Sequence, residues 1–196
     1  MKSSCAPYKG CFKQKGGSYK TAYFAGGCFW GIEEKLNRLE GVIETEVGYM
    51  GGSSKTAKYN RVSSGKTNHR ETVKVIYDPK IIKYTELLSL FFNIHDPTSK
   101  DKQGLDIGKQ YGSAVFNLDK SQTKDYKRFI KQIQKKLPKK ILTKKFHNKK
   151  FYKAENYHQK YYLTQSKCKS LTTENKQVFE KICLNNSTKA EKKYSG

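Results

Sequence analysis

Apolar and polar residues alternate along residues 42–49, where Val47 and Tyr49 fall on one side and Glu44 and Glu46 on the other. A period of two residues predicts a half-buried β-strand. Three other segments have strand-like patterns: residues 20–25, residues 71–77 and residues 113–117. The first of these is apolar on both faces, which predicts a central place in a sheet.

Apolar residues recur with helical spacing in three longer segments: residues 30–39, residues 84–94 and a stretch that follows Asp119. Gln122, three residues after Asp119, completes a capping box at the start of the third helix. We interpret the apolar stripe of this helix as core: Tyr126, Phe129, Ile130, Ile133 and Leu137. Residues 139–153 are basic with a few apolar positions, which predicts an edge strand and a loop.

This order of elements predicts an α+β fold in which helices pack on one mixed sheet. Two polar segments, residues 50–70 and residues 97–111, are predicted to be long loops, and loops of such length tend to be functional. We expect three parts along the chain: an irregular arm over residues 1–18, one main domain over residues 19–166, and a polar tail over residues 167–196.

The chain of 196 residues carries 40 lysine and arginine residues against 17 acidic ones, a formal charge of +23. One interpretation is a protein that binds nucleic acid or another anionic surface. The other is a general lysine bias on solvated faces. Specific readers of nucleic acid rely on arginine for bidentate contacts, so we expect no specific nucleic-acid partner. The chain has only four arginines: Arg38, Arg61, Arg70 and Arg128.

The five cysteines do not form a C-x-x-C pair, which argues against a structural zinc site, and we expect no metal. The size of the chain also argues against a disulfide-stapled secreted scaffold. No apolar run reaches the length of a transmembrane helix, and the first residues lack the apolar region of a signal peptide. We therefore expect a cytoplasmic protein. The alternative is an envelope or periplasmic lipoprotein, because Ser3-Ser4-Cys5 resembles the remainder of a lipoprotein processing site.

Cys28 lies where the first strand ends and the first helix begins, directly after two glycines. The glycines permit a tight turn, and the first turn of a helix presents unpaired N–H groups and partial positive charge. Because both features stabilise a thiolate, we expect the pKa of Cys28 to lie below the usual value of about 8.5. The alternative is a small buried residue in a tight turn, with Phe29 and Trp30 as packing.

Glu71 shares a strand face with Val73 and Val75 and is expected to point inward with them. A carboxyl group among apolar side chains has a raised pKa and can donate a proton near neutral pH. The alternative is an exposed glutamate at the start of a strand. A cysteine hydrolase is a further alternative, since His69 or His95 could serve as its base, although we expect His69 to be solvated.

The segment around Cys28, G-G-C-F-W-G, resembles the active-site motif of the A-type peptide methionine sulfoxide reductases. Other segments resemble motifs of that family in the same order: V-G-Y-M-G-G, T-A-K-Y-N-R-V, H-R-E-T-V-K-V-I-Y-D-P, F-F-N-I-H-D-P-T, K-Q-G-L-D-I-G-K-Q-Y and F-Y-K-A-E-N-Y-H-Q-K-Y-Y. Together the motifs cover residues 20–163. The resemblance implies a two-layer α+β sandwich with a ferredoxin-like core.

The resemblance also implies catalytic residues. Cys28 matches the family's nucleophile and Glu71 its catalytic acid. Tyr59 and Tyr111 match two tyrosines that hydrogen-bond the sulfoxide oxygen. These donors would stabilise negative charge on that oxygen while the thiolate attacks sulfur, as an oxyanion site does. The implied reaction reduces methionine-S-sulfoxide in oxidised proteins and peptides, as a form of protein repair.

Three more residues match the family's substrate pocket. Phe29 and Trp30 match the aromatic cradle for the S-methyl group. Asp106 matches an acidic position near the pocket with a supporting role. We expect a monomer without a bound cofactor, whose partners are oxidised proteins and an external reductant, thioredoxin or dithiothreitol.

Attack by Cys28 leaves a sulfenic acid, which a second thiol converts to a disulfide for the reductant to open. We expect Cys168 to be this resolving cysteine because it lies nearest the matched region. Cys183 is the second candidate, and Cys5 and Cys11 also remain open.

Overall fold

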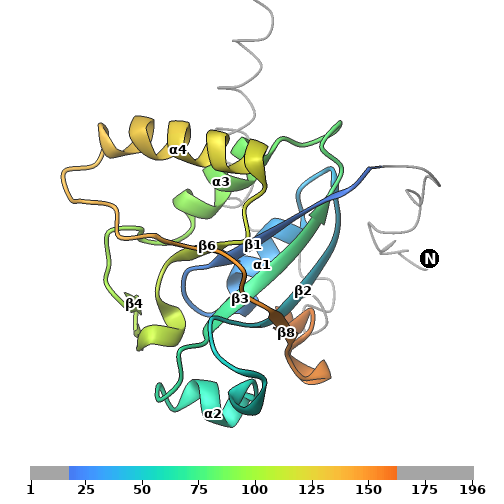
Figure 1. The fold of residues 1–196 in the computed structure, drawn as a ribbon, viewed down its shortest axis with the longest axis vertical. Coiled ribbons are helices and arrows are strands. Elements are labelled where there is room, and N and C mark those ends of the chain that lie inside the picture. Colours follow the sequence, from blue (N-terminus) through green and yellow to red (C-terminus); the bar gives the residue numbers. More distant parts are fainter. Residues whose placement is uncertain (1–17, 163–196) are drawn as a thin grey trace, which may run out of the picture. The chain divides into compact units, whose positions relative to one another are not determined.

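The computed structural model describes residues 18–162, which contain a six-stranded sheet in the order β7-β6-β1-β3-β2-β8 (Figure 1). The strands are β1 (Lys20–Ala25), β2 (Val42–Met50), β3 (Arg70–Tyr77), β6 (Ala114–Phe116), β7 (Lys144–Phe146) and β8 (Phe151–Lys153). Strand β7 runs parallel to β6, whereas the other neighbours are antiparallel. The predicted α+β class with a mixed sheet is therefore confirmed.

Four α-helices accompany the sheet in the described part of the chain: α1 (Phe29–Asn37), α2 (Tyr59–Ser63), α3 (Tyr84–Asn93) and α4 (Lys120–Gln134). Most predicted ends of the strands and helices agree with the structure to within two residues. The exception is α4, which ends at Gln134, before the predicted stripe position Leu137. The single edge strand predicted within residues 139–153 is two short strands, β7 and β8. The two predicted long loops are a different case, since both contain short elements. They hold α2, the 3₁₀ turns η1 (Ser54–Thr56) and η2 (Lys109–Tyr111), and the two-stranded hairpin of β4 (Lys102–Gln103) and β5 (Asp106–Ile107).

The core lies between the sheet and helices α1 and α3. Phe24 of β1 is paired with Val73 of β3, which is paired with Val47 of β2, and all three side chains are fully buried. Phe91 of α3 packs on Phe24 at a ring distance of 5.0 Å. The other face of the sheet carries a smaller apolar cluster that includes Ala25. Strand β1 is thus central and apolar on both faces, as its sequence predicts.

Helix α4 begins with the predicted capping box. The N–H of Gln122 donates to Asp119 Oδ1 at 2.7 Å, and the N–H of Asp119 donates to Gln122 Oε1 at 3.0 Å. The predicted core stripe is only partly right, because Tyr126 is buried whereas the remaining four residues are half-buried. The reason is that α4 packs mainly on α3, through Phe129 and Phe92, and not directly on the sheet.

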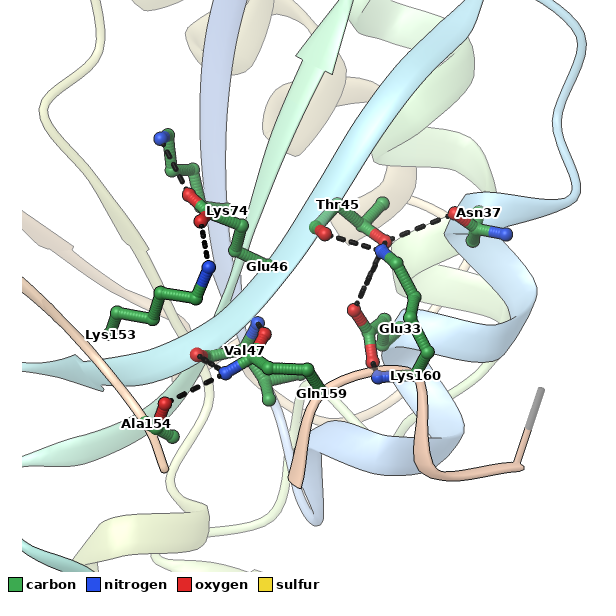
Figure 2. A network of polar contacts seen from close by, with 10 residues as sticks. All are labelled: Glu33, Asn37, Thr45, Glu46, Val47, Lys74, Lys153, Ala154, Gln159 and Lys160. Atoms are coloured by element: carbon green, nitrogen blue, oxygen red, sulfur yellow. Dashed lines mark hydrogen bonds and ion pairs between the residues drawn. The ribbon is translucent and has the colours of Figure 1, made fainter. Parts of the chain in front are cut away.

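The segment after β8 is fastened to strand β2 by Gln159 (Figure 2). The side-chain amide of Gln159 donates to the carbonyl oxygens of Val47 and Ala154, at 2.9 Å each. Its amide oxygen accepts from the N–H of Val47 at 3.0 Å. Gln159 therefore satisfies the backbone of β2 as a neighbouring strand would.

The same segment is tied to α1 by Lys160 and Glu33. The Lys160 ammonium group lies 2.9 Å from Glu33 Oε1, and the Lys160 N–H donates to Glu33 Oε2 at 2.8 Å (Figure 2). The ammonium group also contacts the carbonyl and hydroxyl oxygens of Thr45. Glu33 is buried, so its carboxyl group depends on these donors in place of water.

Replacing Lys160 with Met should leave the buried Glu33 carboxyl without its cation. We expect the free energy of unfolding to fall by about 3 kcal/mol, because a buried uncompensated charge is costly. Urea denaturation measures the change. Lys153→Met is the matched control, since Lys153 pairs with the more accessible Glu46 at 2.7 Å, which Lys74 also neutralises. The control should lose less than about 1 kcal/mol, and equal losses would contradict the assignment.

Candidate active site

Cys28 sits between β1 and α1, as the N-cap residue of the helix. The preceding Gly27 has a φ of +112°, which a residue with a side chain rarely adopts, so the turn depends on glycine here. The N–H groups of Trp30 and Gly31 are directed at the Cys28 sulfur, and the thiol is only half-buried. The helix start therefore presents the thiol together with two hydrogen-bond donors.

Glu71 lies next to this turn. It is the second residue of β3, is 2% exposed, and faces the core as the strand pattern predicts. The N–H of Phe29 donates to Glu71 Oε2 at 3.1 Å. Since Phe29 directly follows Cys28, this bond brings the predicted nucleophile and the predicted acid together across 42 positions of sequence.

The electrostatics of the pair agree with the expectation for Glu71. Burial raises the pKa of Glu71 to about 7, the N–H of Phe29 works against that shift, and the charge of Asp106 adds to it. A pKa of about 7 leaves a large share of the carboxyl groups protonated at neutral pH. Glu71 can therefore act as a proton donor.

The expectation of a lowered pKa for Cys28 is wrong for this structure. Burial, the largest cause, raises the pKa of Cys28 together with the negative charges of Glu71 and Asp106, and the resulting pKa is about 11. The N–H groups of Trp30 and Gly31 lower it but do not compensate. The helix-start effect is thus present but weaker than desolvation.

Two tyrosines reach the same place from distant segments. Tyr59 is the first residue of α2 and Tyr111 the last residue of η2. Burial and then the charge of Glu71 raise the pKa of both, that of Tyr111 to about 12, and Cys28 contributes in each case. Both hydroxyl groups therefore lie near the pair and remain protonated donors. Asp106 of β5 acts electrostatically on all four of these residues.

The two predicted cradle residues differ in exposure. Phe29 is 1% exposed and packs against Tyr49 and His158, at ring distances of 6.0 and 5.4 Å. Trp30 is half-buried and stacks on Tyr161 at 3.9 Å. The rings of Phe29 and Trp30 lie 6.2 Å apart, so both belong to one aromatic cluster next to Cys28, which we call the aromatic wall.

Several residues of this wall were not predicted from the sequence: Tyr49, Glu155, His158, Tyr161 and Tyr162. Four of them lie in residues 155–162, where the density of aromatic residues was a usable signal. Tyr49 could have been found from strand pairing, since it lies opposite Glu71.

A hollow of about 270 Å³ opens beside Cys28 and makes the thiol accessible. It is lined by Gly26, Gly27, Cys28, Gly31, Ile32, Lys35, Ile94, His95, Gln103 and Gly104. This polar hollow adjoins the glycine turn and the face of α1 that carries Lys35. It therefore offers a path from solvent to the Cys28 sulfur.

Neither candidate histidine is placed as a base for the thiol. His95 borders the hollow, but Nδ1 lies 2.5 Å from Phe91 O and Nε2 lies 2.7 Å from Ser113 Oγ. Burial lowers the pKa of His95 to about 4. His69 is fully buried, not solvated as expected, because its ring packs under Gly52 and lies 3.0 Å from Ser53 O. The hydrolase alternative thus lacks its base.

The other cysteines, Cys5, Cys11, Cys168 and Cys183, lie outside the described residues. Within residues 18–162 no cluster of three or more His, Cys, Asp or Glu side chains could hold a metal ion. In that same range, no helix is both long and apolar enough to span a membrane.

The chain matches known proteins over this site. The family model of peptide methionine sulfoxide reductase matches residues 20–191. A relative from Methanococcus maripaludis (strain C6), peptide methionine sulfoxide reductase MsrA, is 44% identical over 149 residues, which are 76% of this chain and 95% of the relative. Mxr1 from Saccharomyces cerevisiae in reduced form superposes with a TM-score of 0.70 and 34% identity, over 79% of this chain and 90% of Mxr1.

A second structure of Mxr1, in complex with Trx2, is also similar. It superposes with a TM-score of 0.51 and 27% identity, over 73% of this chain and 84% of that chain. The family match spans every segment that contributes a described residue to the site.

Replacing Glu71 with Gln should lower the pKa of Cys28. The amide keeps an acceptor for the Phe29 N–H but removes the negative charge that disfavours the thiolate. The measurement is the rate of Cys28 alkylation by iodoacetamide as a function of pH, resolved by peptide mass spectrometry.

Asp106→Asn serves as the control for this measurement. It should lower the pKa of Cys28 by less, because the charge of Asp106 contributes less than that of Glu71. An unchanged or higher pKa in Glu71→Gln would show that the two groups are not coupled.

Proposed function

The chain belongs to the peptide methionine sulfoxide reductase family, and on that premise we propose that the Cys28 thiolate attacks the sulfoxide sulfur while Glu71 protonates the sulfoxide oxygen. The protein is an oxidoreductase that reduces methionine sulfoxide and is recycled by thioredoxin. The observation that carries our assignment of residues is the hydrogen bond from the Phe29 N–H to Glu71, which holds a carboxyl group with a pKa of about 7 beside the thiol.

The chemical step needs an electrophilic sulfur. As the Cys28 thiolate forms a bond to sulfur, electrons move onto the sulfoxide oxygen, and Glu71 supplies a proton to it. The hydroxyl group then moves from the substrate sulfur to the cysteine sulfur, which breaks the substrate S–O bond and the newly formed S–S bond. The cysteine is oxidised to a sulfenic acid, methionine leaves as the reduced thioether, and Glu71 is left ionised. The thiol proton moves to Glu71 before attack and from Glu71 to the oxygen during it, so that atoms and charges balance.

Two hydroxyl groups assist this step. Tyr59 and Tyr111 donate hydrogen bonds to the oxygen while it carries negative charge, and their raised pKa values keep them protonated. Trp30 provides the aromatic surface for the S-methyl group, and the buried Phe29 supports it from the core. The charge of Asp106 supports the protonated forms of the groups around it, because it raises their pKa values. We assign selectivity for the S epimer of the sulfoxide because the family resemblance implies it.

The sulfenic acid at Cys28 then condenses with a second thiol. A Cys168 thiol that attacks the sulfenic sulfur forms a disulfide and releases water, and thioredoxin reduces the disulfide by thiol exchange. Burial and then the charge of Cys28 raise the pKa of Tyr162, so Tyr162 lies near Cys28. Six residues of extended chain from Tyr162 reach at most about 20 Å, so Cys168 can return to the site. The longer tether to Cys183 costs more entropy to close, which favours Cys168.

We also propose the details of the fold that the family resemblance implies. The core order β6-β1-β3-β2, with α1 and α3 as connections, supports a two-layer sandwich with a ferredoxin-like core. We place the catalytic domain at residues 19–166, between an N-terminal arm and a tail that carries Cys168 and Cys183. A monomeric state and a cytoplasmic location remain predictions from the sequence, as does independence from any bound cofactor.

With dithiothreitol as reductant, the protein should reduce a peptide containing the S epimer of methionine sulfoxide and leave the R epimer unchanged. Chromatography of the peptide measures the conversion. Cys28→Ser should abolish it, and Glu71→Gln should lower the rate by roughly 10²- to 10⁴-fold, the range of a lost general acid. Reduction of both epimers, or full activity of Glu71→Gln, would overturn the assignment.

One turnover without reductant should leave a disulfide between Cys28 and Cys168. Peptide mapping of the unreduced protein detects this bond. The matched pair is Cys168→Ser, which should stop disulfide formation, and Cys183→Ser, which should not affect it. A bond from Cys28 to any other cysteine would reject Cys168 as the resolving residue.

A further inference from the structure

Helix α2, which carries Tyr59, has few contacts of its own to fix it. It is five residues long, and Val62 is its only buried residue. Its N-cap residue, Lys58, makes no side-chain hydrogen bond to the helix. A single turn of helix is not stable by itself. The placement of the Tyr59 hydroxyl must therefore be set by groups outside α2.

Glu155 is the group that caps this helix, from 96 positions further along the chain. Its Oε1 accepts the N–H of Tyr59 at 3.0 Å, and its Oε2 accepts the hydroxyl of Tyr49 at 2.9 Å. Tyr49 is fully buried in β2, beside Glu71. One carboxyl group thus joins the first residue of α2 to a fully buried residue of the sheet.

The charge state of Glu155 suits this task. Burial alone would raise its pKa, but the N–H of Tyr59 and the hydroxyl of Tyr49 lower it, and the net shift is downward. An ionised carboxylate accepts both hydrogen bonds strongly and also suits the positive end of a helix.

The ring of Tyr59 is held by the same segment. His158, three residues after Glu155, is 2% exposed and packs on the Tyr59 ring at 4.4 Å. The segment is itself fastened to β2 and α1 through Gln159 and Lys160 (Figure 2). Backbone and ring of Tyr59 are therefore both located by one anchored stretch of chain.

We propose that Glu155 is a positioning residue for sulfoxide reduction, which sets the place of the Tyr59 hydroxyl by capping α2 against Tyr49. The proposal rests on the function assigned above, in which Tyr59 donates to the sulfoxide oxygen. Glu155 does not touch the reacting atoms. A displacement of about 1 Å of a catalytic group can cost about 100-fold in rate, so loss of this anchor should appear in kcat.

The test is a double-mutant cycle of Glu155→Ala with Tyr59→Phe, assayed on the S-sulfoxide peptide. Glu155→Ala should lower kcat about 10- to 100-fold with little change in KM. In the Tyr59→Phe background, the same substitution should lower kcat by less than about twofold, because there is no hydroxyl left to position. Glu155→Gln should restore most of the activity, since its amide oxygen can still accept the Tyr59 N–H.

Two further variants keep the cycle interpretable. Glu155→Asp retains the charge but shortens the side chain, and serves where Glu155→Ala does not fold; its smaller loss should likewise vanish with Tyr59→Phe. Glu86→Ala is the matched control, because the carboxylate of Glu86 caps α3 by accepting the Lys83 N–H at 2.8 Å. The control should leave kcat unchanged.

Hydrogen exchange provides a readout that does not depend on activity. The peptide containing the Tyr59 amide should exchange faster in Glu155→Ala than in the unmodified protein, and Glu86→Ala should not change it. If sulfoxide reduction itself were absent, this exchange difference would still be seen. Unchanged exchange, or kcat losses that simply multiply in the double variant, would overturn the proposal.

Discussion

A buried hydrogen bond joins the start of helix α1 to strand β3, between the N–H of Phe29 and the carboxyl group of Glu71. The proposed chemistry depends on this contact, because it holds a thiol and a carboxyl group from different elements close together. It also uses one of the unpaired N–H groups of the helix start. The glycine turn at Gly27 is what allows the helix to begin at this point of the sheet.

The same proximity sets the protonation of the site. With a pKa of about 7 at Glu71 and about 11 at Cys28, the thiol holds its proton while the carboxyl group loses its own. The proposed attack requires the opposite arrangement, with the proton on Glu71 and the negative charge on sulfur, which is a minor form with the same total number of protons. A sulfoxide oxygen accepts a hydrogen bond only from the protonated carboxyl group. In the proposed mechanism, bound substrate therefore favours the reactive form, so that binding and thiol ionisation are coupled.

Local patterns predicted Cys28 and Glu71 as a pair of reactive groups, whereas Tyr59, Tyr111 and Asp106 came only from the family resemblance. The alternation of residues along the strand alone predicts that Glu71 points inward, and the glycines before Cys28 predict the turn. The direction of the Cys28 pKa could not be predicted, since it depends on burial and on charges from β3 and β5. The aromatic density of residues 155–162 marked the segment, but its contacts could not be predicted, because Glu155 meets Tyr59 across 96 positions and Lys160 meets Glu33 across 127. Such contacts follow from the packed fold and leave no local period in the sequence.

Three glutamates illustrate why contacts between distant segments cannot be predicted from local patterns, because their side chains are identical but their surroundings differ. Glu33 is buried but meets the ammonium group and N–H of Lys160, so its charge is compensated. Glu155 accepts from Tyr59 and Tyr49, and its pKa is lowered. Glu71 receives one N–H and, within the described residues, pairs with no cation, so burial prevails and its pKa rises. The number of donors that the fold directs at each carboxyl group therefore decides which glutamate anchors the structure and which can give up a proton.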